Sequence, residues 1–133
     1  MELKTLKIIQ EELRQLPNTQ AQAQWVRAQC RHVPNDRSIR QMPNFVPGTE
    51  HPAWVSYEIM PHGVKFTMSS DSNDTQGVAG IVVRALDGLT AKEIRSINFT
   101  EFKDVARYLN NRQQRTLNAL LNYIKDIIGE PHG

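Results

Sequence analysis

Residues 78–86 form an almost wholly apolar run that has to be buried in any fold of this chain. Periodicity alone does not tell whether such a run is a buried strand or a buried helix. Its length and its small residues favour a helix, and Gly77 and Gly80 would let another backbone approach that helix closely. Asp87 and Gly88 follow the run and predict its C-terminal end.

Two segments before this run alternate apolar and more polar side chains with a period of two. The alternating apolar residues are Val55, Tyr57 and Ile59, then Val64, Phe66 and Met68. A turn of sequence Met60-Pro61-His62-Gly63 joins the two segments. The pattern predicts a β-hairpin over about residues 53–69 with one buried face.

Helical spacing of apolar residues predicts that much of the remaining chain is α-helical. An amphipathic N-terminal helix is expected to end at Pro17, and its apolar face consists of Leu3, Leu6, Ile9, Leu13 and Leu16. Further helices are expected over about 19–31, from a capping box at Thr90, over about 98–109, and over about 111–128 before Gly129 and Pro131. The predicted fold is α+β, with a small antiparallel sheet packed against helices. We expect an N-terminal helix over residues 1–17 and a single domain over residues 18–130.

Composition limits the classes of protein to consider. The 133 residues are 39% hydrophobic and 23% charged, which is typical of one folded domain and not of long disorder. No apolar stretch is long enough to span a membrane, and Met1-Glu2-Leu3-Lys4 does not resemble a signal peptide. We therefore expect a cytoplasmic protein, or a plastid stromal one after removal of a transit peptide. Sixteen basic against fourteen acidic residues give a net charge of +2, so nucleic-acid binding is not favoured.

Residues 32–53 are predicted to form a long irregular segment, and a loop of this length is typically functional or disordered. Four of the seven prolines lie in it: Pro34, Pro43, Pro47 and Pro52. Arginines flank this loop and the start of the last helix. They predict either a basic surface that attracts an acidic protein partner or an ordinary solvated face. These arginines are Arg27, Arg31, Arg37, Arg40, Arg107, Arg112 and Arg115.

Residues 46–94 carry a resemblance to a known family. They read Val-Pro-Gly-Thr-Glu-His-Pro-Ala-Trp-Val, then the hairpin, Ser-Asp-Ser, the apolar helix and Leu-Asp-Gly-Leu-Thr-Ala-Lys-Glu-Ile. This order resembles the SufE family of sulfur acceptors, which work with cysteine desulfurases in iron–sulfur cluster assembly, and within it the cyanobacterial and plastid branch. The resemblance covers about residues 20–126. It implies a SufE-like fold, with Arg112 near the loop before the first strand.

The sequence departs from the family pattern at the residue that carries sulfur. The family has Gly-Cys where this chain has Gly48-Thr49, and the residues around His51 and Arg115 are also changed. A sulfur acceptor needs a thiolate that attacks a persulfide and holds the sulfur in an S–S bond. A threonine hydroxyl does neither. The resemblance therefore implies a degenerate member that has lost sulfur-acceptor activity.

We expect a noncatalytic binding or regulatory protein whose partner is another protein, either a cysteine desulfurase or an unrelated protein of a photosynthetic cell. The residues expected to form the partner-binding surface are Gly48, Thr49, Glu50, His51, Trp54, Asp71 and Arg112. Trp54 is either core or an exposed docking anchor. Asp71 and the residues after it are most simply a turn and a helix cap.

Alternatives remain open at this stage. An active accessory of a desulfurase would use Cys30, the one cysteine, or would activate the desulfurase allosterically; a half-buried structural Cys30 is the simpler interpretation. A Thr49–His51 nucleophile pair is disfavoured because side chains two apart on an extended loop diverge. A nucleic-acid module built on the arginines ranks last. No cofactor or metal is expected, since the four histidines (32, 51, 62 and 132) lack ligand spacing. Self-association is one way to bury the N-terminal leucines.

Overall fold

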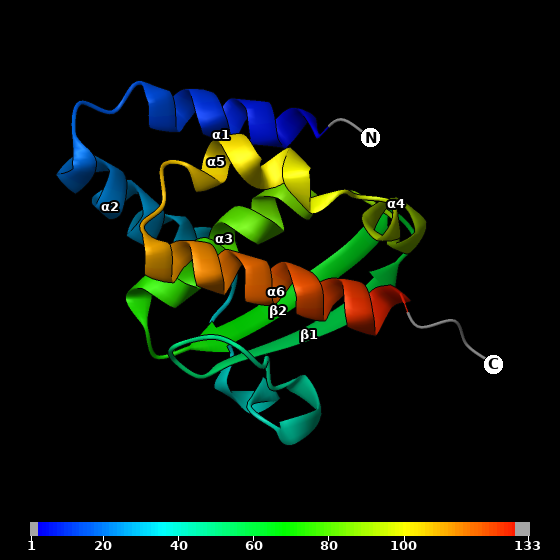
Figure 1. Cartoon of the computed structure of the whole chain (residues 1–133). Helices are drawn as coiled ribbons and strands as arrows, with labels where there is room; N and C mark the ends of the chain where they lie inside the picture. Colours follow the sequence, from blue (N-terminus) through cyan, green and yellow to red (C-terminus); the bar gives the residue numbers. More distant parts are fainter. Residues whose placement is uncertain (1–2, 130–133) are drawn as a thin grey trace.

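A two-stranded antiparallel sheet covered by helices forms the part of the chain that the structure describes, residues 3–129 of a computed structural model (Figure 1). Strands β1 (Ala53–Met60) and β2 (Gly63–Ser70) pair so that Ala53 lies opposite Ser70 and Met60 opposite Gly63. The expected α+β fold, with its hairpin, is therefore confirmed. Pro131 and His132 lie outside the described residues.

The helices follow the predicted order with corrected boundaries. The α-helices are α1 (Lys4–Arg14), α2 (Thr19–Ala28), α3 (Asn73–Leu86), α4 (Ala91–Arg95), α5 (Lys103–Ala106) and α6 (Asn111–Gly129). The 3₁₀ turns are η1 (Gln29–His32), η2 (Arg37–Ile39), η3 (Met42–Asn44) and η4 (Phe99–Phe102). The single helix expected over 98–109 is wrong. Asn98 and Glu101 form a capping box that opens a 3₁₀ turn, and α5 is a short continuation of it.

Helix α3 is the central element, and the apolar run forms most of it. It begins at Asn73, earlier than the run itself, because the Ser72 hydroxyl accepts a hydrogen bond from the Thr75 N–H at 3.1 Å and caps the helix. The expectation of close backbone approach at two glycines is confirmed. A Cβ on Gly77 would overlap the Val26 carbonyl, and one on Gly80 would overlap the Gln29 carbonyl. Helix α2 and turn η1 therefore pack on α3 through main-chain atoms.

The helix expected over residues 19–31 ends early for a related reason. Its α-helical part stops at Ala28, and the chain continues as the tighter turn η1. This change falls where the Gln29 carbonyl meets Gly80 of α3. The Gln29 side chain, 1% exposed, donates to the Trp25 carbonyl at 3.1 Å and accepts from Arg84 at 2.7 Å. Tertiary packing sets this helix end, and no capping signal marks it in the sequence.

The leucine face of α1 is buried within the chain itself. Leu3, Leu6, Ile9 and Leu13 belong to the core, and α1 packs against α3 and α5. An ion pair fastens this packing, because Arg84 of α3 donates to Glu12 of α1 at 2.9 Å. This hydrogen bond from Arg84 is the main cause that holds the pKa of Glu12 below its usual value. The domain boundary at residue 17 stays a prediction.

The predicted buried face of the hairpin is only half correct. Val64, Phe66 and Met68 of β2 and Val55 of β1 are buried, but Tyr57 is 38% exposed and Ile59 is 61% exposed. Strand β2 packs on α3, whereas β1 is the outer strand of the sheet. The alternation in β1 is genuine, but its second half stays largely exposed, and the Tyr57 hydroxyl reaches α6 at 3.4 Å from the Ile127 carbonyl.

Substituting Gly80→Ala should lower the free energy of unfolding by about 3 kcal/mol, the upper end of the overpacking range, because the Gln29 backbone cannot rotate away from a new methyl group. Gly129→Ala is the matched control, since its Cβ would lie 4.0 Å from the nearest atom, the Arg95 Cδ. Urea unfolding followed by circular dichroism measures both variants. Equal stabilities for the two would contradict the backbone contact between η1 and α3.

The Arg84–Glu12 pair predicts a pH dependence of stability. The folded-state pKa of Glu12 is lowered from about 4.5, so the unfolded chain binds this proton more readily than the folded chain does. The contribution of the pair is therefore present above about pH 4.5 and is lost as the pH falls through the folded pKa. Glu12→Gln should be less stable than wild type at pH 7 and should show a flatter decline in acid. Glu58→Gln, at an exposed position, should keep the wild-type pH profile of thermal unfolding.

Candidate functional site

The loop over residues 45–54 rests on the N-terminal half of α6. Its base is closed by a hydrogen bond from the Val46 N–H to the Ala53 carbonyl at 2.9 Å. At its tip Gly48 has a φ of +92°, a conformation that side-chain-bearing residues rarely adopt. A Cβ on Gly48 would lie 3.6 Å from the Ala119 Cβ of α6. The loop tip therefore lies beside α6, and the positive φ rather than a lack of space accounts for glycine at this position.

Thr49 occupies the tip with its hydroxyl turned back into the loop. The side chain is half-buried, and its Oγ1 donates to the carbonyl of His51 at 2.6 Å. The bond therefore goes to the main chain and not to the His51 imidazole, which leaves the hydroxyl without a general base of the kind a nucleophile needs. In this arrangement Thr49 stabilises the local turn.

Glu50 connects the loop to the arginines at the start of α6. Its Oε2 lies 3.4 Å from the Arg112 Nε and 3.9 Å from an Arg115 Nη. All three side chains are well exposed, so the pairs contribute little to stability. The structure places Arg112 beside the loop, as expected, and partly neutralises it with a carboxylate of the same loop.

Trp54 and Asp71 lie beside Arg40, a half-buried arginine that the sequence analysis counted among the basic residues near the loop but not among the site residues. The guanidinium of Arg40 lies 4.9 Å from the centroid of the Trp54 ring, and Phe45 packs edge-on against the same ring at 6.0 Å. Arg40 also donates to the Ser69 Oγ at 2.9 Å and to Asp71 at 3.0 Å. This hydrogen bond to Arg40 lowers the pKa of the Asp71 carboxyl. Trp54 is therefore a half-buried part of an ordered surface rather than a core residue or a free anchor.

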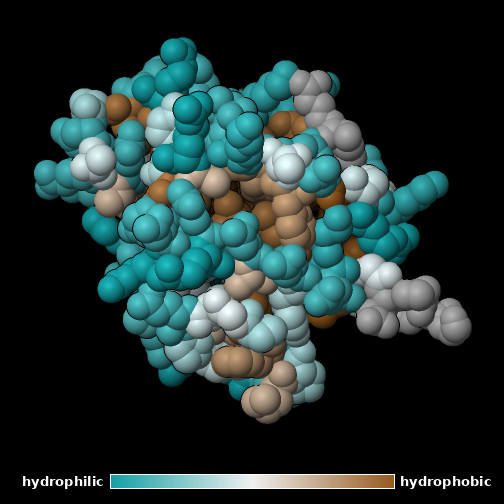
Figure 2. Space-filling model, in the orientation of Figure 1, coloured by the Kyte–Doolittle hydropathy of each residue, from teal (hydrophilic) through white to brown (hydrophobic). Residues whose placement is uncertain are grey.

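The arginines on the N-terminal side of the loop are largely paired with acids and do not form one basic patch. They are Arg27, Arg31, Arg37 and Arg40, and among residues 3–129 all except Arg31 lie within 4 Å of an aspartate. Arg37 lies 3.2 Å from Asp71, and Arg27 lies 3.6 Å from Asp74. Figure 2 shows hydrophobic side chains at the lower tip of the molecule, over the η2–η3 segment, where Met42 is 79% exposed and Phe45 is 37% exposed. The surface around the loop thus combines exposed apolar side chains with paired charges, a composition common at protein–protein interfaces.

A groove of about 450 Å³ runs along α6 from the loop tip, and the sequence analysis missed it. We call it the α6 groove; its lining residues are Pro47, Gly48, Arg115, Asn118, Ala119, Asn122, Tyr123 and Asp126. The α6 members recur at helical spacing and form one polar stripe, a signal present in the sequence. The proline and glycine come from the loop, and no local pattern could bring them here.

Cys30 is exposed on η1, and the half-buried helical position expected for it is wrong. The Cys30 backbone lies beside Gly80 of α3, whereas Gly48 lies on α6 beside Ala119. The thiol and the loop tip are therefore carried by different elements of the fold, and Cys30 does not occupy the position of Thr49.

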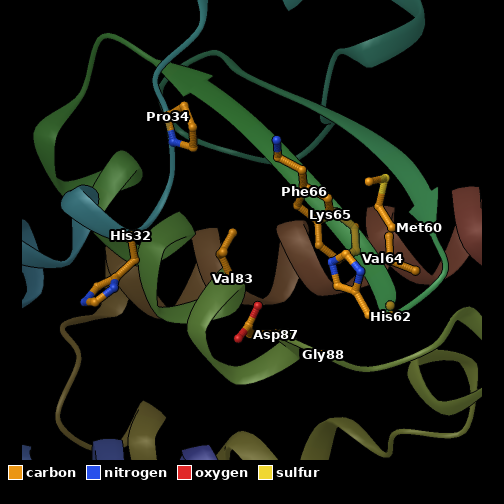
Figure 3. A pocket seen from close by; sticks show the side chains of 11 residues that line it. His32, Pro34, Met60, His62, Val64, Lys65, Phe66, Val83, Asp87 and Gly88 are labelled. Carbon is orange, nitrogen blue, oxygen red and sulfur yellow. The ribbon is translucent and has the colours of Figure 1, made fainter.

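A second cavity of about 440 Å³ lies between the hairpin turn and the end of α3 (Figure 3). His62 and Asp87 lie at its rim, and His32 points away at its edge. Burial is the main cause that lowers the pKa of His32. Among residues 3–129 no three His, Cys, Asp or Glu side chains are grouped closely enough to hold a metal ion. Over the same residues, no helix is long and apolar enough to cross a membrane.

The chain is similar to known proteins both in sequence pattern and in fold. The family model SufE, described as an Fe-S metabolism associated domain, matches residues 7–128. A hypothetical protein from Thermus thermophilus, whose structure was determined in solution, is 16% identical, with a TM-score of 0.77 over 97% of this chain and 96% of that chain. At that identity the likeness shows the fold alone. No curated protein matches the chain.

Replacing Arg40 should disorder the surface around Trp54. Arg40→Met loses the hydrogen bonds to Ser69 and Asp71 and should lower the free energy of unfolding by about 1–3 kcal/mol. It should also speed amide exchange in residues 36–54. Arg37→Met is the matched control, because the Arg37 side chain is 73% exposed and contacts the same Asp71. Equal effects of the two substitutions would show that Arg40 does not organise this surface.

Proposed function

This chain belongs to the SufE family, and on that premise we propose that it is a noncatalytic member. It binds or regulates a protein partner through the loop over residues 45–54 and the neighbouring Arg112, and it no longer accepts sulfur. The family's connection with Fe–S metabolism makes a cysteine desulfurase the first candidate partner. The photosynthetic branch suggested by the sequence, and a cytoplasmic or stromal location, are parts of the same proposal.

The observation that carries the proposal is the oxygen atom at the loop tip. In sulfur transfer an acceptor thiolate attacks the outer sulfur of a donor persulfide, the donor thiolate leaves, and the acceptor then holds the persulfide. Thr49 offers a hydroxyl that is not ionised near neutral pH and that is bonded to the His51 carbonyl at 2.6 Å. An alcohol oxygen cannot take the place of the thiolate in this exchange.

The geometry of the loop supports docking as the remaining role. Gly48 has a positive φ and lies beside Ala119, and Arg112 lies beside the tip, joined to it through Glu50. Trp54 is held by Arg40 in a half-buried position with part of its ring available to a partner. A chain that keeps this surface without a thiol at its tip would occupy a desulfurase without removing its sulfur.

One observation favours a second candidate function. Cys30 is exposed, so a thiol is accessible to a persulfide donor elsewhere on the surface. An active accessory would receive sulfur on Cys30, or would accelerate the desulfurase allosterically without receiving any. These alternatives differ from the first proposal in what the chain carries and in what happens to desulfurase turnover.

Incubation with a cysteine desulfurase and cysteine, followed by intact-mass spectrometry, separates the candidates. We expect no gain of about 32 Da, the mass of one sulfur atom, on the wild-type chain. A gain that disappears in Cys30→Ser would establish the accessory role instead. Faster desulfurase turnover without a mass gain would support allosteric activation.

Thr49→Cys provides the positive control for the docking geometry. If the loop docks on a desulfurase as proposed, this variant should gain about 32 Da under the same conditions. The gain should survive Cys30→Ser in the double variant, which assigns the sulfur to position 49. If the double variant gains no sulfur, the loop does not reach a desulfurase persulfide and the docking proposal fails.

A further inference from the structure

The polar floor of the α6 groove indicates what part of a partner it binds. We propose that the groove holds an extended peptide segment of a protein partner, with an acidic side chain at the Arg115 end and a basic side chain at the Asp126 end. The inference rests on the proposed docking function and names the chemistry of the docked segment.

Two amides on the groove floor match the hydrogen-bonding repeat of an extended chain. Asn118 and Asn122 are exposed, and neither side chain has a hydrogen-bond partner within residues 3–129. They are four residues apart, so they lie on the same side of α6 at a rise of about 6 Å. An extended peptide repeats its orientation every second residue, at about 6.6–6.8 Å. Each amide offers a donor and an acceptor and can therefore pair with the N–H and C=O of alternate peptide residues.

The walls of the groove are fixed before any peptide arrives. The Tyr123 hydroxyl donates to the Pro43 carbonyl at 2.6 Å, which ties the aromatic wall to the η3 turn. On the loop side, Gly48 lies close to Ala119 and leaves no side chain in the floor. Walls that are already in place reduce the conformational entropy lost on binding.

The charges at the two ends set the polarity of the segment. Arg115 stands at one end, with Glu50 at the longer distance of 3.9 Å, so a partner carboxylate can replace that contact. Asp126 stands at the other end and makes no ion pair within residues 3–129. The two residues are separated by about 16 Å along the helix, which an extended chain spans with about five residues.

Selection from a displayed library of random nine-residue peptides tests this inference without any assumed partner. Enriched peptides should carry an acidic and a basic residue about five positions apart. They should bind the Asn118→Ala, Asn122→Ala double variant at least tenfold more weakly than wild type, because up to four hydrogen bonds are lost. Gln20→Ala, Gln24→Ala is the matched control, since these two exposed amides have the same spacing on α2 and should not matter. The absence of any enriched peptide, or equal binding by both double variants, would overturn the proposal.

The affinity of the same variants for a cysteine desulfurase tells whether the groove serves the proposed function. Loss of desulfurase binding in the Asn118, Asn122 variant alone would assign the docked segment to that enzyme. If wild type binds groove peptides but no desulfurase, the partner proposed above is wrong while the groove remains a peptide site.

Discussion

The positive φ of Gly48, which places the loop tip on α6 beside Ala119, is the constraint on which the candidate site depends. This backbone conformation is one that glycine adopts readily, and it brings the loop tip, the arginines of α6 and the α6 groove onto one surface. The core fixes the position of α6, because its opposite face is buried against α3. Because backbone and packing hold this surface, its position does not depend on which side chain stands at residue 49, and the proposal of docking without sulfur transfer relies on this independence.

Much of the fold could be predicted from the sequence because its signals are local. The Thr90 capping box, the apolar run of α3 and the period-two hairpin each depend on neighbouring residues, and all three appear in the structure. The errors arise where distant residues decide. Helix α2 changes to a 3₁₀ turn where Gln29 meets Gly80, and Ile59 of β1 is 61% exposed although it continues the apolar alternation. Neither the contact at Gly80 nor the exposure of Ile59 can be predicted from the local sequence pattern.

The candidate site was less predictable than the fold. The family resemblance directed attention to Gly48, Thr49 and Arg112, and the structure brings these together around Glu50. The resemblance could not indicate that Arg40 would pack against Trp54, since the loop that carries Arg40 has no periodic pattern. The α6 groove combines two distant segments and therefore becomes visible only in three dimensions.

The central claim is that this chain docks without carrying sulfur, and one experiment measures both halves. A cysteine desulfurase loaded with ³⁵S-labelled persulfide is mixed with the chain, the complex is quantified by light scattering, and the two proteins are then separated under non-reducing denaturing conditions. The account predicts a stable complex in which all label stays on the desulfurase. Label on this chain, or the absence of any complex, would contradict it.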